Sequence, residues 1–502
     1  MGADPEVADP APAVVVLVPF PAQGHVTPML QLARALAARG ITATVAVPDF
    51  VRRRMGSVTG DGVELVSIPS GIPDRGGEPP GFASIAHAME HHMPAHLEQM
   101  LTRGHAKCIV VDVLASWAIP VASRCGVPAV GFWTAMLASF RVVSAIPEFL
   151  RQAFISDSGI PILTKGLDKD DEENTDLRIA TNLHILPESL QLGTKEMMPW
   201  LVGCEASQKS RFAFWLQILK RMKSLRCLLV NSFPDEATDE DSDELHPSPQ
   251  GLQILEVGPL SIDGLAENIQ KLPAKNPSMW QADGSCMDWL DQQSPGSVIY
   301  VSFGSWVAPI GPDKINELAL GLEATGRPFL WVLKNDPSWR AGLPAGYLET
   351  VSGRGKIVAW APQGGVLAHE AIGCYLTHCG WNSTLEAIHH GVRLLCYPVS
   401  GDQFINSAFI VKMWGVGIRL RSTGRSDVKD SVEMIMEGDD GKRLQEKMNE
   451  LRERVMVGEA TCVAKRNLGA FVHGIKRDGL AFEHLATKVY DTPPSQIVTH
   501  AS

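Results

Sequence analysis

Short apolar runs of strand length alternate with helical patterns along the chain, and this alternation begins twice. In the first half the runs are VVVLVPF (14–20), ITATVAV (41–47), CIVVD (108–112), VPAVGFW (127–133), CLLVNSF (227–233) and LQILEVGPL (252–260). Strands that are apolar on both faces belong to parallel sheets covered by helices on either side. The pattern therefore predicts an α/β fold with a doubly wound parallel sheet.

The second half repeats the alternation with strands of its own. They are SVIYVSFGS (297–305), PFLWVL (328–333), KIVAW (356–360), CYLTHCG (374–380) and RLLCYP (393–398). Because 502 residues are too many for one hydrophobic core, we expect two facing Rossmann-like domains. Ligands of such domains bind at the carboxyl ends of the strands.

A stretch without periodicity separates the two halves. Residues 262–285 contain Pro273, Pro277 and Gly284 and are typical of a linker. The expected organisation is a disordered tail (1–12), an N-terminal domain (13–261), the linker (262–285), a C-terminal domain (286–465), C-terminal helices (466–490) and a second disordered tail (491–502).

The charge of the chain restricts its partners. The formal net charge is −11 and the pI is near 5.8, whereas nucleic acids and anionic membranes bind basic surfaces. The acidic runs 168–174 and 235–244 are interpreted as solvated loops. We expect no integral membrane segment, because no run approaches the roughly 20 apolar residues of a span. Nine scattered cysteines without disulfide spacing favour the reducing cytoplasm.

One strand and the helix after it form a candidate phosphate site. The stretch 374–391 predicts a strand followed by a helix that begins with Asn382, Ser383 and Thr384. The first turn of a helix offers free N–H groups and the positive end of the helix dipole. The turn 378–383 is therefore suited to bind phosphate.

Two other kinds of site are disfavoured. Cys374, His378 and Cys379 lie within one strand, where neighbouring side chains point to opposite faces, and this argues against a metal site. The chain also lacks a G-x-G-x-x-G sequence, which weakens the interpretation as a dinucleotide-binding dehydrogenase.

A histidine and an aspartate each follow a strand of the first half. His25 precedes a helix with Thr27 and Pro28 in its first turn, where the dipole disfavours imidazolium. We therefore expect a neutral base near pH 7. Asp112 ends the strand 108–112, on the same rim of the sheet, so the two side chains are expected to meet. Taken singly, His25 is also readily explained as a loop histidine that caps or packs, and Asp112 as an N-cap.

The segment from Trp360 to Gln403 is similar, end to end, to the signature box of plant secondary-product glycosyltransferases, a UDP-dependent family with the GT-B fold. The sequences GHVTP (24–28) and VVDVLASWA (110–118) resemble the family's catalytic-histidine and aspartate segments. The resemblance implies an acceptor-binding N-terminal domain and a UDP-sugar-binding C-terminal domain with a cleft between them. It also implies a last helix, for which 478–490 is the candidate, that crosses back onto the N-terminal domain.

The resemblance assigns roles to individual residues. His25 is implied to be the general base, and Asp112 to orient it. At the uridine, the implied ligands are Trp360 and Gln363, and Glu386 is implied to bind both ribose hydroxyls. The implied pyrophosphate ligands are Ser305, His378, Asn382 and Ser383. Asp402 and Gln403 are implied to bind the sugar hydroxyls, and Ala361 and Trp381 to lie beside these donor residues.

The implied reaction is the transfer of glucose from UDP-glucose, with inversion, to a small lipophilic plant metabolite. Neither a cofactor nor a metal is implied, because the helix dipole and His378 would offset the diphosphate charge. Gln403, rather than a histidine, favours glucose over galactose. The enzyme is expected to be a monomer.

The box departs from the common family pattern at several positions. Gly364 and Gly365 stand where larger residues are usual, Arg393 where proline is common, and Tyr397 where tryptophan is common. None of these changes removes a proposed phosphate or ribose ligand. Tyr397, together with Trp306 after the strand 297–305, leaves the choice of sugar and acceptor open.

No readable motif identifies the acceptor. The loops 70–85 and 140–215 are expected to shape its pocket, and the amphipathic segment 211–222 is a candidate wall. The candidates for the apolar lining are Trp117, Phe132, Trp133 and Trp200. Two alternative functions remain: a non-catalytic UDP-sugar or metabolite-binding protein, and a nucleotide-sugar hydrolase or epimerase of the same architecture.

Overall fold

The computed structural model describes most of the chain. The described residues are 13–55, 62–73, 80–162, 185–187, 190, 192–198, 205–234, 251–260, 278–305 and 307–477. Trp200, Trp306, the candidate crossing segment 478–490, both predicted tails and most of the predicted linker lie outside them.

A seven-stranded parallel sheet forms the N-terminal half, in the order β3-β2-β1-β4-β5-β6-β7. Its strands are β1 (Val14–Val18), β2 (Thr42–Pro48), β3 (Val63–Ile68), β4 (Cys108–Asp112), β5 (Ala129–Trp133), β6 (Cys227–Val230) and β7 (Gln253–Glu256). The strand order reverses between β1 and β4, which creates a crevice at their carboxyl ends. His25 follows β1 and Asp112 ends β4, so both lie at this crevice.

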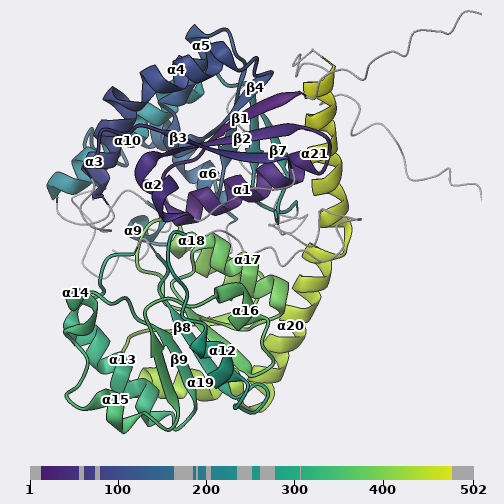
Figure 1. Cartoon of the computed structure of the whole chain (residues 1–502). Helices are drawn as coiled ribbons and strands as arrows, with labels where there is room; N and C mark the ends of the chain where they lie inside the picture. Colours follow the sequence, from purple (N-terminus) through teal and green to yellow (C-terminus); the bar gives the residue numbers. More distant parts are fainter. Residues whose placement is uncertain are drawn as a thin grey trace, which may run out of the picture.

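Helices cover both faces of this sheet (Figure 1). The helices of this half are α1 (Gln23–Ala37), α2 (Asp49–Arg54), α3 (Phe82–His91), α4 (Met93–Arg103), α5 (Ala118–Arg124), α6 (Leu137–Ser144), α7 (Ile146–Arg151), α9 (Thr194–Met197) and α10 (Glu205–Met222), with a 3-10 turn at Val113–Ala115. Because β4 is covered on both faces, all five of its residues are buried, as its apolar sequence predicts.

A six-stranded parallel sheet forms the C-terminal half, in the order β10-β9-β8-β11-β12-β13. Its strands are β8 (Val298–Ser302), β9 (Phe329–Val332), β10 (Gly355–Val358), β11 (Ile372–Thr377), β12 (Leu394–Cys396) and β13 (Gly417–Arg419). The order reverses again, between β8 and β11, and the predicted phosphate turn follows β11. The two parallel sheets confirm the prediction of two Rossmann-like domains.

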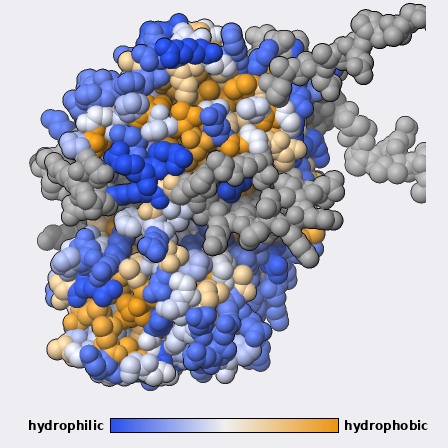
Figure 2. All heavy atoms as spheres, viewed as in Figure 1, coloured by the Kyte–Doolittle hydropathy of each residue, from blue (hydrophilic) through white to orange (hydrophobic). Residues whose placement is uncertain are grey.

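The helices of the second half complete the fold. They are α12 (Ser285–Leu290), α13 (Pro312–Ala324), α14 (Pro337–Arg340), α15 (Tyr347–Thr350), α16 (Gln363–Leu367), α17 (Trp381–His390), α18 (Gln403–Ala408), α19 (Arg425–Met436), α20 (Gly438–Met456) and α21 (Glu459–Lys476), with a π-helical turn at Phe409–Met413. Helix α20 is amphipathic, and polar side chains cover its side of the lower half in Figure 2. Apolar side chains gather in patches in both halves of that view.

The last two described helices connect the halves. In Figure 1, α20 lies along the lower domain, and α21 continues upward beside the sheet of the upper domain. Asn467 of α21 donates from Nδ2 to the carbonyl oxygen of Glu256 in β7, at 2.9 Å. Leu468 and Phe471 are fully buried. The predicted boundary after residue 465 therefore falls inside α21.

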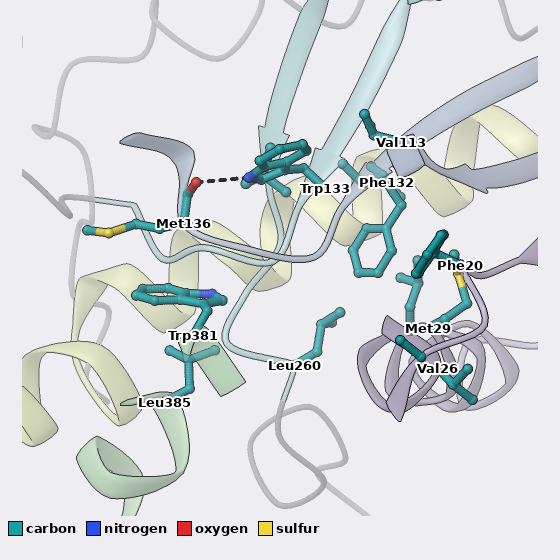
Figure 3. Close-up of a cluster of buried hydrophobic side chains, with 14 of the residues drawn as sticks. Phe20, Val26, Met29, Val113, Phe132, Trp133, Met136, Leu260, Trp381 and Leu385 are labelled. Atoms are coloured by element: carbon teal, nitrogen blue, oxygen red, sulfur yellow. Dashed lines mark hydrogen bonds between the residues drawn. The ribbon is translucent and has the colours of Figure 1, made fainter. Parts of the chain in front are cut away.

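A tryptophan from α17 joins the two domains directly. Trp381 is 4% exposed, its indole nitrogen donates to the carbonyl oxygen of Asn231 at 2.6 Å, and its ring stacks on Phe233. Figure 3 shows Trp381 and Leu385 beside the buried residues of the N-terminal domain, among them Trp133 and Met136. This apolar junction holds the carboxyl ends of the two sheets toward each other.

Candidate active site in the interdomain cleft

A cleft of about 1250 Å³ lies between the carboxyl ends of the two sheets. This volume exceeds that of an ordinary single-ligand pocket and is sufficient for two substrates. All thirteen predicted catalytic and donor residues are described, and all but one line the cleft: His25, Ser305, Trp360, Ala361, Gln363, His378, Trp381, Asn382, Ser383, Glu386, Asp402 and Gln403. Asp112, the exception, lies behind His25.

His25 and Asp112 form a hydrogen-bonded pair. His25 is the third residue of α1, and its Nδ1 lies 2.8 Å from Oδ2 of Asp112, which is 1% exposed. The same carboxylate oxygen accepts from the N–H of Phe20, and Oδ1 accepts from the N–H of Leu114. Asp112 therefore caps the turn after β4, as the simpler interpretation predicts, and also holds the imidazole.

The pair fixes the tautomer of His25. Because a carboxylate only accepts hydrogen bonds, Nδ1 carries the proton and donates to Asp112. Thr134, just after β5, places its Oγ1 3.1 Å from the same Nδ1. Nε2 makes no hydrogen bond to a described residue, and the side chain is 23% exposed. The unprotonated nitrogen is thus available to a molecule in the cleft.

The pKa of His25 differs from the prediction. Burial alone would lower it, but the charge and hydrogen bond of Asp112, together with the charge of Asp402, raise the pKa above its ordinary value. The expectation of a pKa lowered by the helix dipole is wrong, because an adjacent buried carboxylate acts more strongly than the partial charge of a helix end.

Five residues of the C-terminal domain form a second network. The amide nitrogen of Gln363 donates to Oε2 of Glu386 at 2.5 Å and to Oγ of Ser383 at 3.0 Å. Its carbonyl oxygen accepts from the phenol groups of Tyr300 at 3.1 Å and Tyr375 at 3.2 Å. Burial raises the pKa of Glu386, and the hydrogen bond from Gln363 opposes this effect. The network fixes a carboxylate at the cleft wall.

His378 is buried at the end of β11. Burial, and secondly the charge of Lys334, lower its pKa to about 4, so the imidazole is neutral at pH 7. A neutral imidazole carries no charge, so His378 can offset the charge of a diphosphate only by donating a hydrogen bond. A Cβ on Gly304, whose φ is +75°, would lie 2.6 Å from Nε2 of His378, so this close approach requires glycine.

The phosphate turn has the predicted geometry. Cys379 adopts a left-handed φ of 64° and Gly380 caps α17, whose first intrahelical acceptor is the carbonyl oxygen of Gly380. The N–H groups of residues 381–383 therefore have no helical acceptor. Asn382 also reaches across the cleft, because its Nδ2 donates to the carbonyl oxygen of Gly24 at 2.7 Å.

A half-buried lysine supports the loop that carries Ser305. The ammonium group of Lys334 donates to the carbonyl oxygens of Ser305 at 3.0 Å and Val307 at 3.1 Å, and lies over the ring of Trp339. Burial lowers its pKa to about 8. Lys334 thus brings a positive charge close to His378, and no motif in the sequence indicated it.

The ring of Trp360 is packed against a second tryptophan. Its centroid lies 5.7 Å from that of Trp280, with the two rings nearly parallel, and both line the cleft. Trp280 falls within the stretch predicted as linker, so its contribution was missed. Ala361 lies next to Trp360 and is buried.

Asp402 and Gln403 begin α18. Oε1 of Gln403 accepts from the N–H groups of Val399 and Ser400, both at 2.9 Å, while its amide nitrogen makes no hydrogen bond to a described residue. Burial raises the pKa of Asp402, and a hydrogen bond from Asn406 opposes this. The charge of Asp402 acts on His25, so the two domains contribute adjacent polar groups.

The apolar lining differs from the prediction at two positions. Trp133 lines the cleft, but Trp117 and Phe132 do not, since they are 2% and 0% exposed and point into the N-terminal core.

Two of the residues that depart from the family box, Arg393 and Tyr397, do not line the cleft. Arg393 donates to the carbonyl oxygens of Gly441 and Gly373, and Tyr397 packs on Phe303.

Within the described ranges, no three His, Cys, Asp or Glu side chains are grouped so that they would hold a metal ion. None of the helices in the described part of the chain is both long and apolar enough to cross a membrane.

Comparisons with known proteins agree with this architecture. Residues 280–452 match the family model "UDP-glucoronosyl and UDP-glucosyl transferase", and residues 11–126 match "Glycosyltransferase, N-terminal domain". The chain is 43% identical to UDP-glycosyltransferase 82A1 of Arabidopsis thaliana over 470 residues, which cover 90% of this chain and 96% of the relative. It is 29% identical to the (R)-mandelonitrile beta-glucosyltransferase of Prunus dulcis, over 95% of this chain and 97% of the relative.

The fold matches that of solved enzymes of the same family. The crystal structure of Os79 from O. sativa in complex with UDP superposes with a TM-score of 0.76 at 28% identity, covering 92% of this chain and 100% of Os79. Together with the two facing parallel sheets, these matches show that the chain belongs to the plant family 1 UDP-glycosyltransferases and has their GT-B fold.

Proposed function

We propose that this enzyme transfers glucose from UDP-glucose, with inversion, to a hydroxyl group of a small lipophilic plant metabolite. The observation that carries the mechanism is the hydrogen bond between His25 at the cleft wall and the buried Asp112 behind it, while Nε2 of His25 makes no hydrogen bond to a described residue. Nε2 accepts the acceptor's hydroxyl proton while that oxygen attacks the anomeric carbon. The bond from this carbon to the diphosphate oxygen breaks, and UDP leaves with the electron pair.

Asp112 acts through His25. It holds the tautomer in which Nε2 is the acceptor and stabilises the imidazolium that forms. General-base assistance of this kind contributes about 10²- to 10⁴-fold. The cleft supplies the remaining acceleration by holding the two substrates in line.

The proposed donor site uses the C-terminal domain. Trp360 offers an aromatic face to uracil, and Glu386 accepts from both ribose hydroxyls. The diphosphate receives the free N–H groups at the start of α17, the hydroxyls of Ser383 and Ser305 and a hydrogen bond from neutral His378. The helix dipole and Lys334 supply positive charge without a cofactor or metal. Asp402 and Gln403 bind the glucose hydroxyls.

Two observations support glucose as the sugar that is transferred. The amide nitrogen of Gln403 makes no hydrogen bond to a described residue and can donate to a sugar hydroxyl, and the Prunus dulcis relative is a glucosyltransferase by name. We also propose that the enzyme acts as a monomer in the cytoplasm, in keeping with the free cysteines of the described residues.

The release of UDP tests the function. With UDP-glucose and a mixture of plant phenolics, terpenoids and hormones, we expect UDP and glucoside to form in equal amounts. UDP release at the same rate without acceptor would indicate a hydrolase, and the absence of release under all conditions would indicate a binding protein.

We expect the pH profile to report the raised pKa of His25. Only neutral imidazole accepts a proton, so kcat/KM for the acceptor should rise with pH, with a midpoint above the ordinary histidine value of 6.5. In Asp112→Asn the plateau should fall and the midpoint should shift to lower pH, because the charge that stabilises imidazolium is gone. A midpoint that is the same in both proteins would contradict this assignment.

We expect Tyr375→Phe to weaken donor binding without changing the chemical step. The substitution keeps the ring and removes one of the two phenol groups bonded to Gln363. One neutral hydrogen bond corresponds to about a 2- to 10-fold rise in KM for UDP-glucose at unchanged kcat. The double variant with Tyr300→Phe should raise KM further, because the carbonyl oxygen of Gln363 then loses both of its phenol donors. An unchanged KM in the double variant would exclude this positioning role.

A further inference from the structure

The acceptor half of the cleft has an apolar wall with one cation on it. The wall is formed by Phe82, Leu114, Trp133, Val143, Phe214 and Trp215. Among the described lining residues of the N-terminal domain, Arg211 is the only charged side chain besides the proposed base. It projects from α10, the segment predicted to wall the acceptor pocket.

Arg211 lies over an aromatic ring, and no acidic side chain in the described part of the chain pairs with it. Its guanidinium carbon lies 5.9 Å from the ring centroid of Phe82, which packs edge to face on Phe214 at 5.3 Å. In the described ranges no carboxylate lies within 4.0 Å of this guanidinium. Arg221, ten residues along the same helix, provides a contrast, because it binds Glu90 through two hydrogen bonds of 2.8 and 2.7 Å.

A guanidinium without a protein carboxylate can bind one from a ligand. Its planar fork matches a carboxylate with two parallel N–H donors, and such charge-assisted bonds are stronger than neutral ones. Because the net charge of −11 repels anions from the molecule as a whole, the attraction must be local to the cleft. Flat rings suit the neighbouring aromatic wall.

We propose that the acceptor is an aromatic hydroxy acid whose carboxylate binds Arg211 while its hydroxyl group reaches His25. This inference rests on the proposed glucosyl transfer and specifies the acceptor class. The carboxylate takes no part in the reaction. The hydroxyl oxygen forms the bond to the anomeric carbon and loses its proton to His25, and UDP is the leaving group, so the product is a glucoside and not a glucose ester.

Matched acceptor pairs test the proposal. We would measure kcat/KM at saturating UDP-glucose for 4-hydroxybenzoic, 4-hydroxyphenylacetic, 4-hydroxyphenylpropionic and 4-hydroxycinnamic acids and for their methyl esters. These pairs vary the distance from hydroxyl to carboxylate. For at least one pair, we expect the acid to exceed the ester by about 10-fold or more, the range of one charge-assisted hydrogen bond.

Two variants separate the role of Arg211 from general effects of charge. Arg211→Met keeps the length of the stem, and should lower kcat/KM for the preferred acid by about 10-fold while leaving its ester unchanged. Arg221→Met, the control on the same helix, should keep the preference for the acid, because its guanidinium already binds Glu90. Thermal unfolding of each variant shows whether the fold is intact.

The outcomes separate this inference from the function on which it rests. The inference would be overturned if the preference for the acid survived in Arg211→Met, or if acids and esters reacted at equal rates. It would also be overturned if no acid were turned over, or if the product were an alkali-labile glucose ester. Glucosides formed only from neutral acceptors would overturn it and leave the transferase function standing. The absence of glucose transfer to every acceptor would overturn the function itself.

Discussion

The substitution His25→Ala is expected to lower kcat for an alcohol or phenol acceptor by about 10²- to 10⁴-fold, the range of general-base catalysis. UDP binding should remain within about twofold of the wild type. The imidazole contacts Asp112 and Thr134 in the N-terminal domain, whereas the proposed donor ligands belong to the C-terminal domain. Steady-state kinetics and calorimetric titration with UDP measure the two effects separately.

The acidity of the acceptor gives a sharper version of this test. An acceptor that is already ionised at the assay pH needs no base, so the defect of His25→Ala should shrink as the acceptor pKa falls through a series of substituted phenols. A defect of constant size across the series would indicate that His25 serves only for packing.

The chain offers a matched control for the loss of a His–Asp pair. His369 lies outside the cleft, and its Nε2 is 3.1 Å from Oδ1 of Asp291. His369→Ala removes a comparable contact and should leave kcat unchanged. If both variants lost activity to the same degree, destabilisation rather than catalysis would explain the effect of His25→Ala.

The second large effect is expected for Glu386→Ala, which should raise KM for UDP-glucose on the order of 100-fold with a smaller change in kcat. The estimate assumes two charge-assisted hydrogen bonds to the ribose diol. Gln363 holds the carboxylate in place, since its amide nitrogen lies 2.5 Å from Oε2 of Glu386. Initial rates at varied donor concentration and saturating acceptor give both constants.

A donor that lacks one hydroxyl turns this prediction into a double-mutant cycle. UDP-glucose with a 2′-deoxyribose should bind the wild type more weakly than the normal donor. In Glu386→Ala the two donors should bind equally, because the acceptor of that hydrogen bond is gone. An equal penalty for the deoxy donor in both proteins would remove Glu386 from the ribose site.

Much of the fold could be predicted from the sequence because buried parallel strands are apolar without interruption. The run 108–112 coincides with β4, and the run 374–380 overlaps the second half of β11; both strands are buried along their full length. The meeting of His25 and Asp112 followed from the same logic, since the carboxyl ends of β1 and β4 flank the reversal of strand order.

Other parts of the site gave no sequence signal, because their roles depend on tertiary contacts. Tyr300 and Tyr375 are ordinary strand residues in the sequence, and only the pairing of β8 with β11 brings both phenol groups to Gln363. The position of Thr134 beside His25 could not be predicted either, because many polar residues follow a strand and nothing in the sequence distinguishes this one. Trp280 lies in an aperiodic stretch, where no pattern marks a residue that packs on Trp360.

The pKa shifts of His25 and His378 could not be predicted from the sequence, and for a common reason. For His25, the helix dipole was considered without the distance to Asp112, which decides the direction of the pKa shift. For His378, burial lowers the pKa to about 4, and the order of residues does not show how deeply the side chain is buried. Charge states depend on desolvation and on distances of a few ångströms, neither of which the order of residues specifies.

The central claim is that this enzyme transfers glucose by direct displacement at the anomeric carbon, with His25 as the base. The most direct measurement is the NMR coupling constant of the anomeric proton in the first glucoside formed from UDP-glucose, whose glucose is α-linked. We predict a β-glucoside in an amount equal to the UDP released, and its loss in His25→Ala. An α-glucoside, or free glucose in place of a glucoside, would contradict the claim.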